Sequence, residues 1–236
     1  MEPTFSFVLP AYKEAENLKV LIPKIIELFS SYKFEIIIVD DGSNDGTVEI
    51  IKKNQATFPD IILIERGSLK GIGSALIDGY DAARGQYIVS FDSDLSFSFE
   101  GIQQIAETLL TGSYDMVLGS RYLSGSYYEA PNFRVWRKKI ISKMGNIFLR
   151  VISGIPLHDY SANCRGIRRL SWSNIKVNSR DNFMLFETIY RIHKAGGSLC
   201  EVPVKFYNRK FGFSKLKLGK EFFVFFSQLF KLYSNK

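Results

Sequence analysis

Two aspartates, Asp92 and Asp94, directly follow an apolar stretch, residues 87–91. This stretch, Tyr-Ile-Val-Ser-Phe, has the β-branched and aromatic composition of a strand. At a strand end, alternate residues point the same way, with α-carbons roughly 6–7 Å apart. Two carboxylates placed in this way repel each other unless a cation lies between them. Mg²⁺ suits such a pair, because it uses few protein carboxylates and fills its shell with water and phosphate oxygens. The pair therefore predicts a metal–diphosphate site; the alternative is a solvated turn.

Further acids follow two other predicted strands. Glu14 comes shortly after residues 5–9, and Asp40 and Asp41 directly follow residues 35–39. Open α/β sheets bind ligands at the carboxyl ends of their strands. We therefore expect these acids to grip the hydroxyl groups of a nucleotide, or a metal that holds its phosphates. For Glu14 alone, the alternative is an acid favoured by the dipole at a helix start.

The elements that position these acids alternate between strand and helix over residues 5–119. Strands are predicted at 5–9, 35–39, 61–64, 87–91 and 115–119, with helices between them. This order predicts an α/β fold with a mostly parallel sheet, right-handed crossovers and flanking helices. The segment Lys70-Gly71-Ile72-Gly73 lacks the Gly-Lys-Ser/Thr ending of a P-loop, and no Rossmann glycine fingerprint follows the first strand. An ATPase and a dinucleotide-dependent oxidoreductase are therefore disfavoured.

The alternation ends after residue 121. One long helix is predicted at 134–153, with an apolar side, six basic residues elsewhere, and no acid between Arg134 and Leu157. A helix carrying Glu187 is expected at 183–195, and a strand at 199–207. Residues 217–233 contain an aromatic run flanked by lysines: Phe222, Phe223, Phe225, Phe226 and Phe230. We expect one domain, 1–236, with a Rossmann-like nucleotide-sugar half (1–121), an acceptor half (122–216) and a C-terminal amphipathic helix (217–236).

Composition is that of an ordinary globular chain of 236 residues, with 46% hydrophobic and 23% charged residues. The formal net charge of +7 favours an anionic partner. The two cysteines, Cys164 and Cys200, lack metal-ligand spacing and are expected to be reduced buried thiols. The chain shows no secretory signal, and no run approaches the ~20 apolar residues of a spanning helix.

The motifs together resemble the family 2 glycosyltransferases of the GT-A fold, over nearly the whole chain. Within that family, the resemblance is closest to dolichol-phosphate mannose synthases and other polyprenyl-phosphate glycosyltransferases. The matching segments are Pro10–Glu14, Val39–Ser43, Asp45–Thr47, Lys70–Gly73, Asp92–Leu95, Gly119–Arg121, His158–Arg165, Glu201–Val204 and Arg209–Leu216. The sequence departs from the relatives at Ser96, where they carry Gln, and at Ala162-Asn163-Cys164, where they carry Ser-Gly-Phe.

This resemblance implies roles for individual residues. Nucleotide-sugar binding is implied for Pro10, Tyr12, Glu14, Val39, Asp41, Lys70, Asp92, Ser93, Asp94, Arg121, Arg209 and Lys215. Of these, the catalytic residues are expected to be Asp92, Asp94, Arg121, Arg209 and Lys215. Arg137 and Ser142 are the expected contacts of the acceptor phosphate. The metal ligands are expected to be Asp92, Asp94 and Ser96, and the metal Mg²⁺ or Mn²⁺.

The implied reaction is transfer of a hexose, with inversion, from a nucleoside-diphosphate sugar to a polyprenyl or dolichyl monophosphate. GDP-mannose is the implied donor. An ionised phosphate is already a nucleophile, so no strong base is required, and His158 and His193 are expected to be structural. The implied partners are the two substrates, a membrane surface and a small membrane-anchoring protein. Nucleic acid is not an expected partner.

Three alternatives remain. A family 2 enzyme could use UDP-glucose or UDP-N-acetylhexosamine, or could glycosylate a polysaccharide or other hydroxyl, for which Asp94 or Asp159 would be the base. A nucleotidyltransferase also carries acids at strand ends, but no glycine-rich signature follows the first strand. A non-catalytic protein could bind nucleic acid on the basic helix, although the chain has no known nucleic-acid motif.

Location is predicted from the two amphipathic segments, 134–153 and the aromatic run within 217–233. Helices with an apolar face beside lysines and arginines lie in the plane of a membrane interface. We expect a cytoplasmic protein, peripheral at the cytosolic face of a membrane. The alternative is that both apolar faces pack on the sheet.

Overall fold

The computed structural model describes residues 2–209 and 218–234; between 218 and 224 it describes the backbone only. Its elements, in chain order, are β1 (Phe5–Ala11), α1 (Ala15–Leu28), β2 (Phe34–Asp40), α2 (Thr47–Gln55), β3 (Ile61–Glu65), α3 (Ile72–Ala82), β4 (Tyr87–Phe91), α4 (Phe99–Thr111), β5 (Met116–Ser120), β6 (Tyr127–Tyr128), α5 (Phe133–Ser153), β7 (Cys164–Arg168), α6 (Arg169–Ser173), α7 (Met184–Lys194), β8 (Leu199–Pro203), β9 (Lys205–Phe206) and α8 (Leu218–Ser234). The α/β alternation predicted for residues 5–119 is confirmed.

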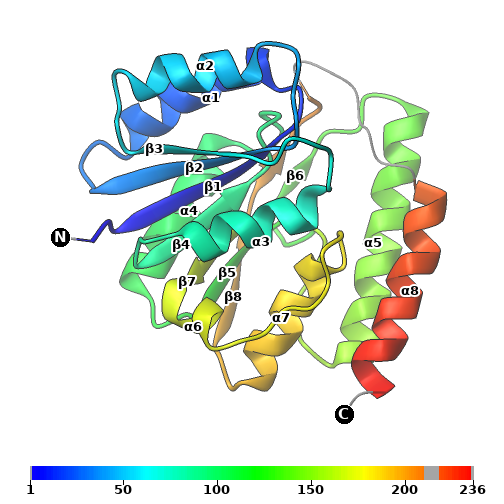
Figure 1. The fold of residues 1–236 in the computed structure, drawn as a ribbon. Helices are drawn as coiled ribbons and strands as arrows, with labels where there is room; N and C mark the ends of the chain where they lie inside the picture. Colours follow the sequence, from blue (N-terminus) through cyan, green and yellow to red (C-terminus); the bar gives the residue numbers. More distant parts are fainter. Residues whose placement is uncertain (1, 210–217, 235–236) are drawn as a thin grey trace.

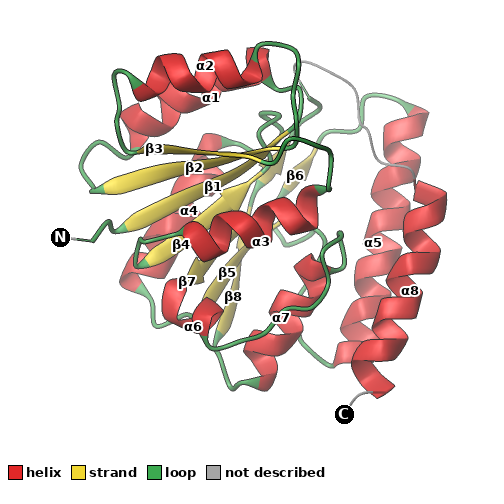
Figure 2. Ribbon diagram, viewed as in Figure 1, coloured by secondary structure: helices red, strands yellow, loops and turns green. Residues whose placement is uncertain are grey.

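A seven-stranded sheet forms the centre of the molecule, in the order β3-β2-β1-β4-β7-β5-β8 (Figure 2). Strands β1 to β4 pair in parallel, as do β5 and β8. Strand β7 lies between β4 and β5 and is antiparallel to both. The mostly parallel sheet was predicted, whereas β7 and the small β6–β9 pair were not.

Helices cover both faces of this sheet (Figure 1). Along β1, Phe5, Phe7 and Leu9 contribute to a core with α1, α2 and α4, whereas Val8 points to the opposite core, formed with α3 and α7. This alternation follows from the two-residue period of a strand. It explains why β1 and β2 are apolar nearly throughout: both of their faces are covered.

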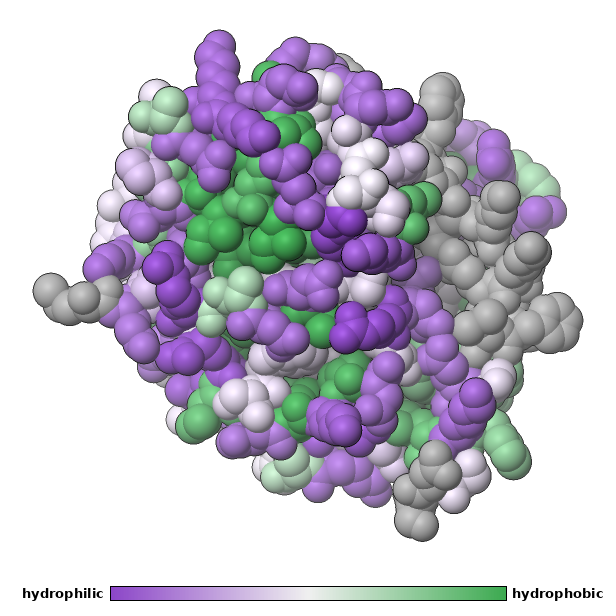
Figure 3. Space-filling view, viewed as in Figure 1, coloured by the Kyte–Doolittle hydropathy of each residue, from purple (hydrophilic) through white to green (hydrophobic). Residues whose placement is uncertain are grey.

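The sheet is less completely covered at its outer strand, β3. Ile62 and Ile64 of β3 are only partly buried, and Figure 3 shows a hydrophobic area over this edge beside α3. Elsewhere this face is mostly hydrophilic.

Helices α5 and α8 form a pair beside the body of the molecule (Figure 1). Phe148 of α5 and Phe226 of α8 pack with ring centroids 5.3 Å apart. On α5, only Asn146 and Leu149 are buried, so its apolar side does not pack on the sheet. Among the described residues, no helix has the length and apolar character that crossing a bilayer requires.

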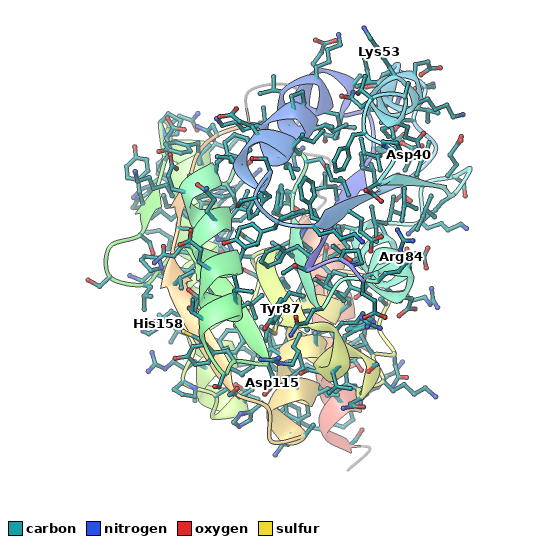
Figure 4. All side chains as sticks on the ribbon, turned by 90° about the vertical axis from the view of Figure 1, so that its left-hand side faces the viewer. Asp40, Lys53, Arg84, Tyr87, Asp115 and His158 are labelled. Carbon is teal, nitrogen blue, oxygen red and sulfur yellow. The ribbon has the colours of Figure 1, made fainter. Side chains whose placement is uncertain are left out.

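Polar contacts link segments at the amino ends of the strands, which lie opposite the carboxyl ends of β1, β2 and β4 (Figure 4). The carboxylate of Glu35, in β2, accepts hydrogen bonds from Ser6 (2.6 Å) and from the Arg84 side chain (2.7 Å). Asp115, before β5, accepts hydrogen bonds from Ser171 (2.5 Å) and from the backbone of Ser198 (2.8 Å). Each oxygen of these two carboxylates accepts a hydrogen bond, so neither acid is open to a ligand.

Candidate active site

A cavity of about 580 Å³ opens at the carboxyl ends of β1, β2 and β4. Most of the residues predicted to bind a nucleotide sugar line it: Pro10, Tyr12, Glu14, Asp41, Lys70, Asp92, Ser93, Asp94 and Arg209. The parallel pairing of the three strands brings these segments together from widely separated parts of the chain. A volume of this size is within the range of small-molecule sites.

The two central aspartates are held by different partners. Asp92 Oδ1 accepts a hydrogen bond of 3.0 Å from the side-chain amide of Asn163. Asp94 Oδ1 accepts one of 3.0 Å from the backbone of Ser96. Leu95 follows with a φ of 60°, a conformation that few non-glycine residues adopt. The bend at Leu95 lets the Ser96 amide turn back onto Asp94.

The Asp92 carboxylate is buried beside a second acid. Burial and the neighbouring Asp94 carboxylate raise the pKa of Asp92 to about 7. A cation against the pair would reverse this effect, because it favours the ionised form. The donor set, two carboxylates open to a cavity, fits a hard divalent ion that takes its other ligands from phosphate and water.

Arg209 supplies positive charge to the same place. Its Nε lies 2.7 Å from Asp94 Oδ2, and its Nη1 lies 3.8 Å from Glu14 Oε1. Arg209 comes from the chain just after β9, far in sequence from both acids. The prediction that Arg209 belongs to the site with the two aspartates therefore agrees with this geometry, and its contact with phosphate stays a prediction.

The far end of the cavity is built around Asp41. Its carboxylate lies 2.8 Å from Arg66 Nε and accepts a 2.9 Å hydrogen bond from the backbone of Gly71. Burial raises the pKa of Asp41, although Gly71 and Arg66 oppose the shift. Gly73, in the first turn of α3, lets the backbone at Asp181 approach closely, since a β-carbon there would lie 2.0 Å from the Asp181 carbonyl oxygen.

Two of the predicted residues have roles beside the cavity rather than in its lining. Val39, a residue of β2, is fully buried in the core that the sheet forms with α3 and α7. Ser96, predicted as a metal ligand, is 1% exposed and contacts Asp94 through its backbone N–H. Lys215, predicted to grip phosphate, lies outside the described residues.

Arg121 belongs to a second polar cluster and is not among the residues that line the cavity. Its Nε and Nη2 contact the Asp159 carboxylate at 2.7 and 3.0 Å, and Nη2 donates to Ser161. Burial acts against both charges, yet Arg121 lowers the pKa of Asp159, and Asp159 raises that of Arg121. Asn146 extends this cluster to the Ser142 carbonyl (3.0 Å). The guanidinium of Arg121 is therefore committed to Asp159 in this structure.

Of the two predicted acceptor-phosphate residues, Ser142 lies on α5, where its backbone carbonyl accepts the hydrogen bond from Asn146. Arg137 is exposed on α5.

His158, expected to be structural, has its Nδ1 2.8 Å from Glu201 Oε2. Cys164 and Cys200 are free thiols, and only Cys164 is fully buried.

The cavity also contains residues that the sequence did not single out, among them Asp181, Asn182 and Phe183, which precede α7. Phe225 of α8 lines it too and packs on Phe183 with ring centroids 4.9 Å apart. The expectation that Phe225 faces a membrane is therefore wrong. Phe222 and Phe223 fall among the residues whose side chains are not described.

A larger cavity, about 930 Å³, lies between α7 and α8 and shares Phe183 with the smaller one. Glu187 is the one carboxylate among the described residues that line it, and it accepts hydrogen bonds from the backbone of Asn178 and Ser179 and from Arg191. Among the described residues, this cavity therefore shows no pair of open acids, and none of those predicted for the site lines it.

Comparison with known proteins identifies relatives along most of the chain. The family model described as Glycosyl transferase family 2 matches residues 6–175. Polyprenol monophosphomannose synthase of Mycolicibacterium smegmatis is 31% identical over 216 residues, which are 89% of this chain and 79% of that protein. Dolichol-phosphate mannosyltransferase of Pyrococcus furiosus is 33% identical over 96% of this chain, which spans only 63% of that protein.

Solved structures share the fold at lower identity. Glucosyl-3-phosphoglycerate synthase from Mycobacterium tuberculosis, solved with phosphoglyceric acid, has a TM-score of 0.67 and 17% identity, over 89% of this chain and 73% of that one. A mannosyltransferase from Pyrobaculum calidifontis, solved with GDP-Man and Mn²⁺, has a TM-score of 0.59 and 20% identity, over 90% of this chain and 59% of that one. The predicted GT-A type of α/β fold is confirmed.

Proposed function

Since the chain belongs to glycosyltransferase family 2, we propose that it transfers mannose from GDP-mannose to a polyprenyl monophosphate, with inversion. The observation that carries the proposal is the cavity itself: Asp92, Asp94 and Arg209 meet there beside the lining from β1, β2 and α3. The mannose synthases of M. smegmatis and P. furiosus, each above 30% identity, support the choice of sugar and acceptor.

In this proposal, a phosphate oxygen of the acceptor forms a bond to the anomeric carbon while the bond to the donor diphosphate breaks. No proton has to move, because both the attacking and the leaving oxygens are phosphate oxygens. The chain's tasks are to orient the two substrates and to stabilise the leaving diphosphate. Tyr12, Glu14 and Asp41 would hold the nucleoside end of the donor.

Asp92 and Asp94 would hold a Mg²⁺ or Mn²⁺ ion, which when bound neutralises charge on the leaving diphosphate. Within the described residues, no three or more His, Cys, Asp or Glu side chains form a metal cluster. Such an ion would thus use the aspartate pair and substrate oxygens, as Mg²⁺ does in other phosphate sites. Arg209, 2.7 Å from Asp94, would turn to the diphosphate once its carboxylate partners are engaged.

The surroundings of Asp94 and Asp159 also favour a phosphate acceptor over a hydroxyl acceptor. A hydroxyl needs a base, for which Asp94 and Asp159 were the candidates. Asp94 is paired with Arg209, and Asp159 holds Arg121 through two contacts. The lowered pKa of Asp159 makes it a weak proton acceptor. This observation ranks the polysaccharide alternative below the lipid phosphate.

The acceptor side of this proposal is a membrane surface. Nine large apolar side chains of α5 are more than one-third exposed: Phe133, Trp136, Ile140, Ile141, Met144, Ile147, Phe148, Val151 and Ile152. Phe230 of α8 is 75% exposed. The segment between Arg134 and Leu157 contains basic residues and no acid. An apolar helix face with cationic flanks suits an anionic bilayer surface. A small membrane-anchoring protein is the other candidate for this face.

Nucleotide binding tests the donor half of the proposal. We expect GDP with Mn²⁺ to raise the Tm of the protein more than UDP with Mn²⁺ does, and EDTA or Asp92→Asn to remove most of the shift. A larger shift with UDP would support the UDP-sugar alternative instead. If neither nucleoside diphosphate shifts the Tm, the proposed donor site is wrong.

A further inference from the structure

A buried polar chain runs from α3 to the aspartate pair. Tyr80 Oη and Ser90 Oγ are 2.6 Å apart, Ser90 Oγ donates to Asn163 Oδ1 at 2.9 Å, and Asn163 Nδ2 donates to Asp92 Oδ1 at 3.0 Å. Tyr80 and Ser90 are 1% exposed and Asn163 is 3% exposed. Buried polar side chains are costly unless they are paired, so a chain of them beside the site requires a reason.

The direction of the hydrogen bonds follows from the number of protons. Ser90 has one hydroxyl proton, which it gives to Asn163 Oδ1, so Tyr80 must be the donor in its bond to Ser90. Burial raises the pKa of Tyr80, which keeps this proton in place at ordinary pH. With its oxygen held by Ser90, the amide of Asn163 can present only its N–H groups to Asp92.

Packing and strand pairing also fix the positions of Tyr80 and Asn163. The ring of Tyr80 stacks edge-on against Trp172 with centroids 4.9 Å apart, and Trp172 Nε1 donates to Asp81 at 2.9 Å. Asn163 directly precedes β7, whose antiparallel pairing sets Phe91 opposite Cys164. The unusual antiparallel strand thus delivers the amide to the residue that follows β4, which is Asp92.

We propose that Tyr80, Ser90 and Asn163 are positioning residues that orient the Asp92 carboxylate for the divalent ion, with Asn163 in direct contact and the other two acting through it. One oxygen of Asp92 is then taken by the amide, and the other is left for the cavity. The inference rests on the proposed metal–diphosphate function and assigns this task to side chains outside the lining. Partners behind a metal ligand commonly fix its orientation and affinity.

The test measures Mn²⁺ affinity in the presence of GDP, by the electron paramagnetic resonance signal of free Mn²⁺, for the full chain. We expect Ser90→Ala and Asn163→Ala each to weaken Mn²⁺ binding by about tenfold. The double variant should be no weaker than either single one, because Ser90 acts through Asn163. Ser90→Thr keeps the hydroxyl and should retain most of the affinity, and Tyr80→Phe should cause a smaller loss.

Ser6→Ala provides a matched control, because Ser6 is an equally buried serine whose hydroxyl bonds Glu35 at the opposite edge of the sheet. It should lower the Tm and leave Mn²⁺ affinity unchanged. If Ser90→Ala does not fold, the comparison of Asn163→Ala with Tyr80→Phe decides.

Tight Mn²⁺ binding by the wild type and equally tight binding by the variants would overturn this inference alone. Additive losses in the double variant would overturn the relay through Asn163. If the wild type itself does not bind Mn²⁺ with GDP, the metal step of the proposed function fails, and the inference fails with it.

Discussion

At the scale of single residues, the carboxylates fall into two groups with opposite surroundings. Asp115, at the amino edge of the sheet, receives hydrogen bonds that outweigh burial and lower its pKa. Asp92, at the carboxyl edge, has a pKa raised to about 7 by burial and by Asp94. The first arrangement stabilises the fold, whereas the second leaves a demand for positive charge. Perturbed groups of the second kind are typical of functional sites.

Substitution of the aspartates separates these two roles. We expect Asp94→Asn to lower kcat by about 10²-fold or more, since it removes one of the two carboxylates for the metal and the ion pair with Arg209. Asp115→Asn should lower the Tm and leave kcat within a factor of about two. Steady-state kinetics measure kcat, and thermal melts measure the Tm. An active Asp94→Asn enzyme, or full activity of the wild type in EDTA, would contradict the assignment.

Arg209 is expected to act mainly in the transition state, when charge develops on the leaving diphosphate. Arg209→Lys keeps one charge but loses the planar fork of the guanidinium. We therefore expect kcat to fall more than the affinity for the donor does. A rise in KM at unchanged kcat would instead assign Arg209 to ground-state binding.

Much of this site could be predicted because its residues directly follow strands. Glu14, Asp41, Asp92 and Asp94 owe their convergence to parallel pairing, which the sequence pattern predicts. Asp181, Phe183 and Phe225 could not be found in the same way, because they reach the cavity only through the packing of α7 and α8. Nor does any local pattern show that Arg121 pairs with Asp159, 38 residues away.

At the scale of elements, β7 is the strand of the main sheet that the sequence pattern does not indicate. Its residues Cys-Arg-Gly-Ile-Arg include two arginines and a glycine, a composition that does not favour a strand. Arg165 is fully buried nevertheless, because the carbonyl groups of Ala162 and Leu185 accept its hydrogen bonds. Tertiary contacts thus override the local preference. The predicted helix at 134–153 is confirmed as α5, one residue longer at its start.

The exposed faces of α5 and α8 lead to a prediction about membranes. Val151 and Phe230 are 77% and 75% exposed, so replacing both with Ser should reduce sedimentation with anionic vesicles at low salt and leave the Tm nearly unchanged. Transfer to a long-chain acceptor in vesicles should fall more than transfer to a short, water-soluble isoprenyl phosphate.

Phe225→Ser is the matched comparison, because Phe225 lines the cavity. It should reduce transfer to both acceptors. If the Val151 and Phe230 replacements do not alter vesicle binding, the face is free to serve another occupant, such as a membrane-anchoring protein, and the vesicle assignment is wrong.

At the scale of the whole molecule, stability should depend on acidity. Asp45, Asp115, Asp159 and Glu187 have lowered pKa values, because hydrogen bonds or ion pairs outweigh burial. As pH falls below the ordinary values of 3.8 for Asp and 4.5 for Glu, the unfolded chain takes up protons first. The contribution of these four groups to the free energy of unfolding should therefore be largest above these values and fall as pH drops through their folded-state pKa values. The raised pKa values of Asp41 and Asp92 act in the opposite direction, at pH values above 3.8.

Urea denaturation between pH 3 and pH 7 measures this dependence. Asp115→Asn should flatten the curve in the acidic range, because one of the groups responsible is removed. An Asp115→Asn variant whose unfolding free energy falls as steeply as that of the wild type in the acidic range would contradict the role of Asp115 in this dependence.

The most direct test of the account is a transfer assay with radiolabelled GDP-mannose, polyprenyl phosphate and Mn²⁺, followed by extraction into organic solvent. We predict that label enters the organic phase only when acceptor, divalent ion and enzyme are all present, and that Asp94→Asn abolishes this transfer. Label that stays in the aqueous phase with every divalent ion tested would contradict the proposed reaction. So would label that appears on a hydroxyl acceptor while polyprenyl phosphate remains unmodified.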